Sequence, residues 1–215
     1  MTTSEENYIK VIYHLSLVSP TGVNTNAIAG MLNTKASSVS EMLKKLSDKN
    51  LLIYQKYQGV NLTETGLLSA KMIVRKHRLW EVFLVEKLNF SWDEVHEIAE
   101  ELEHIKSEKL INKLDEFLDF PAFDPHGDPI PDENGAVKKV EKLLLSDAKL
   151  NVDYQCVGVK DTSAAFLQYL DKQKISLGCK IKVIDKENFD ETLTLQMQNN
   201  TLTISNKIAI NLYIK

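Results

Sequence analysis

The sequence has few cysteines and lacks long apolar runs. Cys156 and Cys179 are its only cysteines in 215 residues, and they lie far apart without a C-x-x-C pattern. We therefore expect reduced thiols in a cytoplasmic protein, with a disulfide between the two as the less favoured alternative. No stretch of 18 apolar residues and no N-terminal signal pattern occurs, so we expect neither a membrane span nor export.

Histidine and proline are also scarce, and both are unevenly distributed. Four of the five histidines lie between residues 77 and 126, and four of the five prolines lie between residues 119 and 135. The prolines predict an extended linker, because proline has no backbone N–H donor and interrupts helices. The histidines, which have carboxylates near them in the sequence, provide nitrogen and oxygen donors of the kind that divalent transition metals bind.

The net charge of −4 conceals an asymmetry between the two parts of the chain. Residues 1–79 carry a net charge of +5, whereas residues 80–215 carry −9. This asymmetry is typical of a domain that contacts phosphates followed by one that does not.

The N-terminal region has the pattern of a winged helix-turn-helix. Helical spacing predicts helices over residues 4–17, 25–32 and 36–49, with Ile28, Met31 and Leu32 facing inward on the second. Two short strands, 51–54 and 60–63, then flank a polar tip with a glycine, which predicts a β-hairpin wing. The third helix and the wing carry hydroxyls and charges suited to DNA contacts, namely Lys35, Ser37, Ser38, Ser40, Glu41, Lys44, Lys45, Lys56 and Tyr57.

A long helix is predicted over residues 64–88, and its second half is apolar nearly all round. Such a helix must be covered on more than one side. We therefore predict a homodimer, which also suits a protein that reads two half-sites. Burial of the same surface within one chain is the alternative.

The stretch from Ser91 to about residue 118 combines an apolar face with potential metal ligands. Ser91 and Glu94 form a capping-box pattern, and the helix expected after it has an apolar face through Val95 and Ile105. A solvated polar face is the simplest interpretation of its charged side. The preceding helix, however, adds an i, i+4 pair, His77 and Glu81, which favours a metal site. The charged side of the expected helix consists of His96, Glu100, Glu103 and His104.

The C-terminal region changes from helical to β patterning. A weak helical pattern covers residues 136–145. Strands are then predicted over 154–159, 181–184, 192–196, 201–204 and 207–214, with a helix over 162–170 and turns at Gly178 and at Asn199-Asn200. The predicted fold class is therefore mainly α with a small β domain.

Several strings in residues 1–130 match one known family. They are Glu6-Asn7-Tyr8, Ser37-Ser38-Val39-Ser40, Gly59-Val60-Asn61-Leu62-Thr63, Lys76-His77-Arg78-Leu79, Glu94-Val95-His96, Glu100 to His104, Pro125-His126-Gly127 and Pro129-Ile130-Pro131. On these strings the chain resembles the metal-dependent repressors of the diphtheria toxin repressor and manganese transport regulator family.

The resemblance implies a homodimeric, cytoplasmic transcriptional repressor that binds Mn(II) or Fe(II), with Zn(II) as a further ion in vitro, and acts at operators of metal-uptake genes. It also implies a winged helix-turn-helix domain (1–75), a helical dimerisation and metal-binding domain (76–145) and an SH3-like, iron-transport-protein-A-like domain (146–215).

The resemblance also implies two metal sites. The primary site would use Asn7 with Glu100, Glu103 and His104, and with His77 close by. The second site would use Glu81, Asp124 and His126, with Asp161 from the C-terminal domain. In the iron branch the second site instead matches His77, Glu81 and His96, and the two versions share Glu81.

Three positions depart from the family pattern. Asn7 stands where relatives have aspartate or methionine. Lys10 stands where manganese regulators have a second carboxylate, which argues against their two-metal cluster. Glu100 replaces a cysteine of the iron regulators and so favours Mn(II).

Two other functions are the alternatives. The first is a winged-helix regulator that does not respond to metal, in which the histidines serve structure. The second is a metallohydrolase, but H-E-x-x-H and other hydrolase signatures are missing from the sequence. We therefore expect a protein that is not an enzyme, that binds double-stranded operator DNA and that has neither a small-molecule substrate nor a membrane partner.

Overall fold

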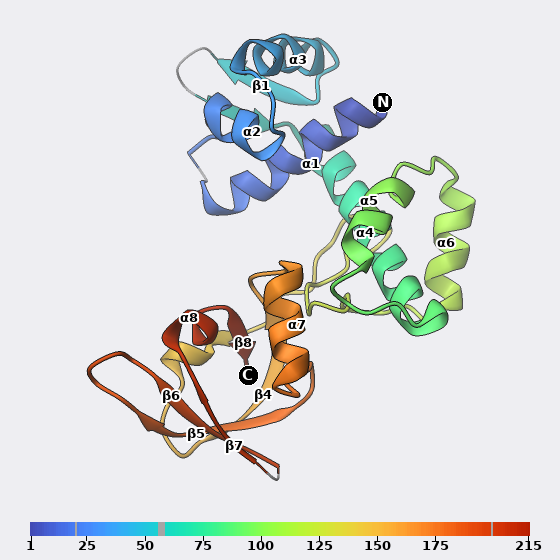
Figure 1. Ribbon diagram of the computed structural model, residues 1–215. Helices are drawn as coiled ribbons and strands as arrows, with labels where there is room; N and C mark the ends of the chain where they lie inside the picture. Colours follow the sequence, from blue (N-terminus) through green and yellow to red (C-terminus); the bar gives the residue numbers. More distant parts are fainter. Residues whose placement is uncertain (20, 56–58, 199) are drawn as a thin grey trace. The chain divides into compact units, whose positions relative to one another are not determined.

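The computed structural model describes residues 1–215 except 20, 56–58 and 199, and it packs as two compact units. The first unit consists of residues 1–78, 100–113 and 131–137. The second consists of residues 79–99, 114–130 and 138–215. Helix α4 (Glu64–Leu88) contributes residues to both units and has the bounds that the sequence predicted (Figure 1).

The first unit opens with the predicted winged helix-turn-helix. Helices α1 (Thr3–Val18), α2 (Thr25–Met31) and α3 (Ala36–Asp48) precede an antiparallel pair of strands, β1 (Leu52–Gln55) and β2 (Gly59–Leu62). Thr2 begins α1 with a capping box, and the Asn24 side chain accepts the N–H of Asn26 at the start of α2. The wing tip, with Lys56 and Tyr57, lies outside the described residues.

Eight of the sixteen residues of helix α1 are buried. Its apolar side chains join those of α2, α3 and both wing strands in one core, in which Ile9, Ile12 and Ile28 are fully buried. The predicted inward position of Met31 is wrong, because this side chain is 61% exposed at the end of α2. Three charged residues of α1 are also buried, namely Glu5, Glu6 and Lys10. Buried charges require partners, and the partners of Lys10 are Glu100 and Glu103, which belong to the candidate site.

The helix predicted after Ser91, with an apolar face from Val95 to Ile105, ends earlier than predicted. Helix α5 (Val95–Leu102) ends before Glu103, and α6 (Glu108–Phe117) begins after a turn. The Ser107 hydroxyl accepts the N–H of Leu110 and so supports the new helix start. The interruption places Glu103 and His104 in the turn between the helices.

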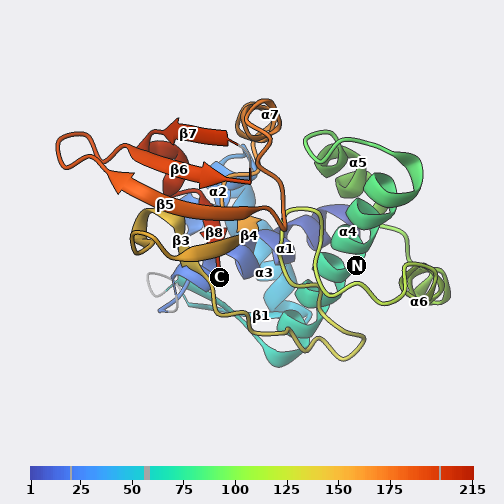
Figure 2. The same ribbon diagram turned by 90° about the horizontal axis from the view of Figure 1, so that it is seen from below.

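The C-terminal part of the second unit is a six-stranded antiparallel sheet with the strand order β3-β8-β4-β5-β6-β7 (Figure 2). Register shifts in the β4–β8 and β5–β6 pairs mark bulges, which bend a sheet and increase its twist. Helix α7 packs Phe166, Leu167 and Leu170 into the core of this sheet. The strands are β3 (Leu143–Leu144), β4 (Asp153–Val159), β5 (Lys180–Lys186), β6 (Leu193–Met197), β7 (Asn200–Ile204) and β8 (Leu212–Ile214), and the helix α7 spans Ala164–Lys172.

Two predicted elements of this region are wrong. Residues 136–142 are irregular and lead into β3 and a short 3-10 turn, η1 (Leu145–Asp147), instead of a helix. The predicted last strand is divided into α8 (Asn206–Ala209) and β8, since Ala209 belongs to a helical turn that contributes to the core. Cys156 and Cys179 are free thiols, as expected. The predicted hairpin turn at Asn199-Asn200 falls partly outside the described residues.

Aromatic side chains gather where the end of α4 meets the end of α6 in the second unit. Trp80 and Phe83 contact edge to face with ring centroids 5.7 Å apart, and Phe83 lies 6.3 Å from Phe117. Phe117 is 63% exposed and Leu88 is 51% exposed. Part of the apolar surface of α4 is therefore covered within the chain, and part remains exposed. Among the described helices, none combines the length and apolarity needed to cross a membrane.

Candidate metal centre

The first unit brings together three potential metal ligands from α4 and from the segment that follows Ala99. One ligand atom each from His77, Glu100 and Glu103 lie within 4.8 Å of one another. The Nδ1 atom of His77 is 2.7 Å from Oε2 of Glu103 and 3.8 Å from Oε1 of Glu100. The Glu103 side chain is fully buried, so its carboxylate needs positive or hydrogen-bonding partners. We call these three residues the first cluster.

Lys10 of α1 supplies a positive charge to the first cluster. Its Nζ atom lies 2.7 and 2.8 Å from the two carboxylate oxygens of Glu103 and also donates to Oε1 of Glu100. The residue is only 7% exposed. Burial raises the pKa of Glu103, but the hydrogen bond from His77 and the charge of Lys10 outweigh burial and leave this pKa below its ordinary value. Glu103 is therefore an ionised carboxylate, whose Oε2 accepts hydrogen bonds while Oε1 is held by the charge of Lys10.

His104 and Asn7 occupy different surroundings from those of the first cluster. The Nδ1 atom of His104 lies 2.6 Å from Oε2 of Glu6, whereas its Nε2 atom is 3.9 Å from Oε1 of Glu103. The Oδ1 atom of Asn7 is buried and accepts no hydrogen bond from the part of the chain that the structure describes. Sequence reasoning did not identify Glu6 as a partner of His104. Its one available signal was its position beside Asn7.

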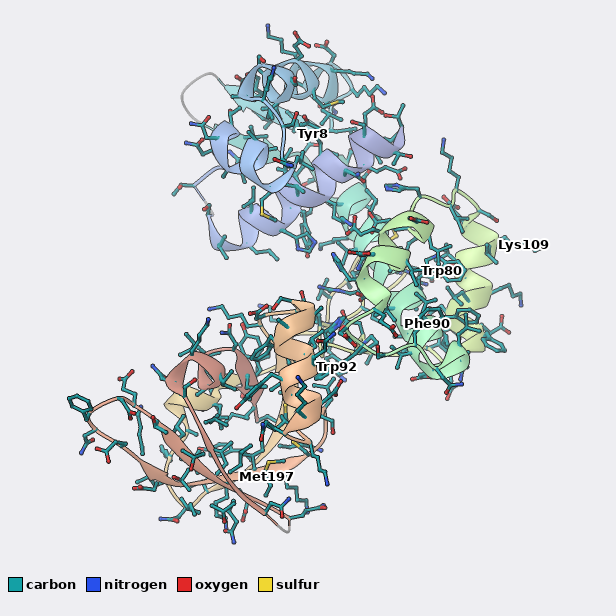
Figure 3. All side chains as sticks on the ribbon, viewed as in Figure 1. Tyr8, Trp80, Phe90, Trp92, Lys109 and Met197 are labelled. Atoms are coloured by element: carbon teal, nitrogen blue, oxygen red, sulfur yellow. The ribbon has the colours of Figure 1, made fainter. Side chains whose placement is uncertain are left out.

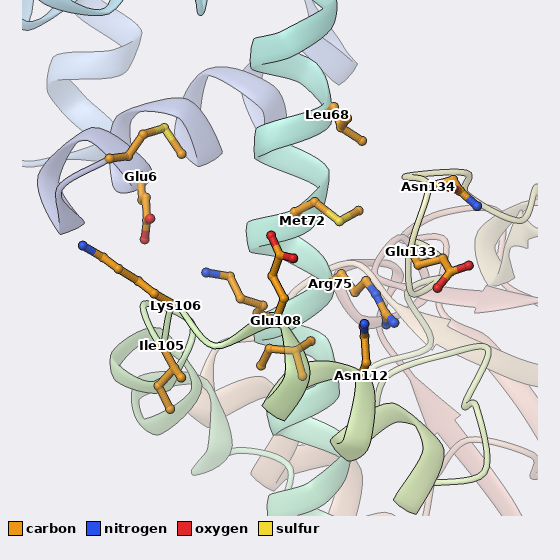
Figure 4. A pocket seen from close by; sticks show the side chains of 13 residues that line it. Glu6, Leu68, Met72, Arg75, Ile105, Lys106, Glu108, Asn112, Glu133 and Asn134 are labelled. Carbon is orange, nitrogen blue, oxygen red and sulfur yellow. The ribbon is translucent and has the colours of Figure 1, made fainter.

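A cavity of about 620 Å³ opens beside this region within the first unit. Glu6 of α1 and Arg75 of α4 line the cavity together with Lys106 (Figure 4). Glu108 and Glu133 add negative charge to the same walls. The mixture of charges favours no single class of ligand, but the cavity reaches Glu6, the partner of His104.

The second unit contains a separate group of potential ligands, which we call the second cluster. One ligand atom each from Glu81, Asp124 and His126 lie within 4.8 Å of one another. All three residues are buried, with exposures of 2%, 5% and 3%. The Nδ1 atom of His126 is 3.6 Å from Oε1 of Glu81. Two carboxylates and one imidazole form a donor set that suits Mn(II) and Fe(II).

Local backbone contacts hold His126 and Asp124 in position. The Nε2 atom of His126 lies 2.8 Å from the carbonyl oxygen of Trp92, and the two rings stack at 14°. Trp92, which is labelled in Figure 3, is anchored in turn. Its Nε1 donates to Asp171 of α7. Oδ1 of Asp124 accepts the backbone N–H groups of His126 and Asp128. Because Nε2–H of His126 donates to the Trp92 carbonyl, Nδ1 keeps the lone pair that can bind a metal.

Gly127 is required for the backbone path beside His126. Its φ is +84°, and a Cβ at this position would lie 2.1 Å from the carbonyl oxygen of Val157. A side chain larger than hydrogen would therefore push the 124–127 segment away from β4.

The remaining predicted ligands of the second site are His96 and Asp161. His96 is exposed, and its Nδ1 is 3.8 Å from Oε1 of Glu81. Oδ1 of Asp161 accepts the N–H of Ser163 at the start of α7, and among the described residues Asp161 joins no group of three ligands. The structure thus brings Glu81, Asp124 and His126 together and leaves Asp161 outside.

The candidate DNA-binding surface is the outer face of α3. Its small and charged side chains are exposed, except for Ser40, which is half-buried and donates to the Ala36 carbonyl. Lys45 has its Nζ 2.9 Å from Glu5 of α1, and Lys49 lies 2.7 Å from the same carboxylate. These two lysines hold α3 against α1. The exposed predicted residues are Lys35, Ser37, Ser38, Glu41, Lys44 and Lys45.

Comparison with known proteins agrees with this arrangement of domains. Residues 1–60 match the N-terminal DNA binding domain of iron dependent repressors, residues 63–132 match the metal binding and dimerisation domain of the same proteins, and residues 143–215 match the FeoA domain. The predicted SH3-like domain at the C-terminus is thereby confirmed.

Individual relatives are regulators of the same kind. The chain is 35% identical over 119 residues to an uncharacterised helix-turn-helix transcriptional regulator of Methanocaldococcus jannaschii, covering 55% of this chain and 95% of the relative. It is 30% identical to the transcriptional regulator MntR of Oceanobacillus iheyensis, covering 70% of this chain and 95% of MntR. A solved manganese-dependent transcriptional repressor in complex with manganese has a TM-score of 0.83 and 30% identity, with 98% of each chain covered.

Proposed function

Because this chain belongs to the iron dependent repressor family, we propose that it represses metal-uptake genes by binding their operators as a metal-loaded homodimer. Membership makes it a metal-dependent transcriptional repressor, and the relatives are regulators that respond to manganese or iron. Beyond family membership, we propose the metal site, the homodimer and the metal-uptake genes as targets. We also propose that the protein acts in the cytoplasm, where its DNA lies.

The second cluster is the main support for the proposal. The exposed lysines and serines of α3 add a surface suited to DNA. Glu81 and Asp124 are two buried carboxylates that face the imidazole of His126. A bound divalent ion would neutralise these two carboxylates. The protein contributes the three donor atoms and the hydrogen bond from His126 to the Trp92 carbonyl, which orients the ring.

The donor types support Mn(II) or Fe(II) as the physiological ion. The second cluster has oxygen and imidazole donors, and both thiols of the chain lie elsewhere, in or beside β4 and β5. Carboxylate and imidazole donors suit Mn(II) and Fe(II) in type, whereas intrinsic affinity rises from Mn(II) to Zn(II), so Zn(II) would also bind this site in vitro.

The exposed aromatic surface supports a dimer. Leu88 and Phe117 are more than half exposed beside the partly covered rings of Trp80 and Phe83. A twofold partner would bury this surface and would place two α3 helices for two half-sites. The domains we propose are residues 1–75 for DNA, 76–145 for dimerisation and metal, and 146–215 as the SH3-like domain. The domain matches support this division.

The test begins with a DNA duplex selected from a random pool by the Mn(II)-loaded protein. Mn(II), Fe(II) or Zn(II) is then titrated into chelator-treated protein while binding to the labelled duplex is followed by fluorescence anisotropy. We expect Mn(II) or Fe(II) to tighten binding by between about fivefold and 150-fold, the usual range of allosteric coupling. Binding of equal strength with and without metal would instead support a metal-independent winged-helix regulator.

A further inference from the structure

Lys10 is a charged residue in an unusual place, since its ammonium group lies among the potential ligands of the first cluster. It contacts both oxygens of Glu103 at 2.7 and 2.8 Å and also Oε1 of Glu100. Divalent ions bind carboxylate oxygens at about 2.0 to 2.6 Å, so the ammonium lies close to where such an ion would lie. The first cluster therefore already contains a cation that belongs to the protein.

The alternative is that Lys10 swings away and leaves the cluster to a metal ion. Lys10 is 7% exposed, and Glu103 is fully buried. Moving the ammonium away would remove the nearest full positive charge from a buried carboxylate and leave it beside the imidazoles of His77 and His104. A buried charge that loses its partner strongly destabilises a fold. A divalent ion entering beside the ammonium would be repelled by it at short range, where a partly buried environment screens charge weakly.

In the second cluster, Glu81 faces two imidazoles. Its Oε1 lies 3.6 Å from Nδ1 of His126 and 3.8 Å from Nδ1 of His96. An imidazole becomes a metal ligand by giving up a proton, whereas an ammonium group with no lone pair cannot ligate. The ammonium of Lys10 therefore cannot become a metal ligand, whereas the imidazoles beside Glu81 can.

We propose that Lys10 permanently takes the place of a metal ion in the first cluster, so that each chain binds one divalent ion, at Glu81, Asp124 and His126. The inference rests on the proposed metal response and assigns that response to the second cluster. It also means that α1 is joined to Glu100 and Glu103 by the protein's own charge in both the metal-free and the metal-loaded protein. In this chain the role that a metal would have in fixing the first helix is carried out by a lysine.

The test counts Mn(II) ions bound to the chelator-treated full-length protein, using the electron paramagnetic resonance signal of free Mn(II). We expect one ion per wild-type chain. Glu100→Gln, at a side chain that is 36% exposed, should leave that count unchanged, whereas Glu81→Gln should weaken the single site by more than tenfold. Lys10→Glu, which replaces the cation with a carboxylate, should bind a second ion.

Lys49→Met is the matched control, because it removes another lysine that pairs with a buried carboxylate of α1, Glu5, without touching either cluster. It should bind one ion, like the wild type. Circular dichroism establishes that each variant is folded. If Lys10→Glu does not fold, the wild-type count and Glu100→Gln still decide the question.

The possible outcomes separate this inference from the proposed function. Two ions per wild-type chain, or one ion that is weakened by Glu100→Gln and kept by Glu81→Gln, would overturn the role of Lys10 and leave a metal-dependent repressor. A folded Lys10→Glu variant that binds one ion would also overturn it. Wild-type protein that binds neither Mn(II) nor Fe(II) would remove both conclusions together.

Discussion

The imidazole of His126 lies with Nε2 2.8 Å from the carbonyl oxygen of Trp92 and with Nδ1 3.6 Å from Oε1 of Glu81. One nitrogen is thus fixed by the backbone while the other faces a carboxylate. This is the arrangement that prepares a histidine for a metal ion, because the hydrogen bond selects the tautomer.

We predict that His126→Ala will weaken Mn(II) binding by at least about tenfold, in line with the effect of losing supporting contacts alone. Isothermal titration calorimetry with Mn(II) measures the change. His14→Ala, at an exposed position of α1, is the control and should bind Mn(II) like the wild type. Equal affinities for His126→Ala and wild type would exclude His126 as a ligand.

His96 distinguishes the two versions of the second site. It is exposed and lies 3.8 Å from Glu81, whereas Asp124 and His126 are buried beside the same carboxylate. We expect His96→Ala to change Mn(II) affinity by less than threefold, and Asp124→Asn to lower it by more than tenfold. The reverse order in the same calorimetric titration would favour the iron-branch ligand set.

Alanine substitutions at Gly127 and Gly30 should change the stability of the protein in opposite directions. A Cβ at Gly127 would lie 2.1 Å from the Val157 carbonyl oxygen, whereas a Cβ at Gly30 in α2 meets nothing within 4 Å. Gly127→Ala should therefore destabilise the protein by roughly 1–3 kcal/mol or more and also weaken Mn(II) binding. Gly30→Ala should stabilise it by about 0.5–1 kcal/mol, because alanine favours helices. Urea unfolding of both variants measures these changes, and equal midpoints would contradict the prediction.

Glu5 should make the stability of the first unit depend on pH. Hydrogen bonds from Lys49 and Lys45 lower the pKa of Glu5 from 4.5 to about 2. The folded state therefore binds the Glu5 proton less readily than the unfolded state does. The resulting stabilisation is present above pH 4.5 and is lost as the pH falls from 4.5 towards 2.

Glu5→Gln tests this contribution by urea unfolding at several pH values. The variant should be less stable than wild type at pH 7, and the difference between the two should shrink as the pH falls from 5 to 2. A difference that is constant over this range would show that the ionised carboxylate of Glu5 is not responsible.

Much of the fold was predictable because it depends on local patterns. Helical spacing predicted the bounds of α4. The capping residue Asn24 predicted the start of α2, and the glycine at the wing predicted the hairpin. The end of α5 was not predictable in this way. Glu103 leaves the helix to pair with Lys10 and His77, which are 93 and 26 residues away, and no local periodicity records such distant contacts.

The candidate site shows the same limit. Family resemblance suggested Asn7, Glu100, Glu103 and His104 as one ligand set, but the structure pairs His104 with Glu6 and balances Glu103 with Lys10. Three members of the second set come together as predicted. Their closeness in space depends on where the segment with Asp124 and His126 lies beside Glu81 of α4. Local sequence patterns do not specify that position.

Lys44 on α3 provides a test of the DNA-binding surface. It is exposed on the face that we assign to DNA, whereas Lys109 is exposed on α6 in the helical region. Lys44→Ala should reduce the dependence of log affinity on log salt by roughly one unit of slope, because one phosphate contact is lost. Lys109→Ala should leave the slope unchanged. Anisotropy titrations at several salt concentrations on the selected duplex measure both, and equal slopes for the two variants would remove Lys44 from the DNA surface.

The most direct test of the account compares the wild type and Glu81→Gln on the selected duplex, each with Mn(II) and with chelator. If an ion at Glu81, Asp124 and His126 controls DNA binding, Mn(II) tightens the wild type at least about fivefold and has no effect on the folded variant. Equal tightening of the two proteins by Mn(II), or equally tight binding by the chelator-treated and the loaded wild type, would contradict it.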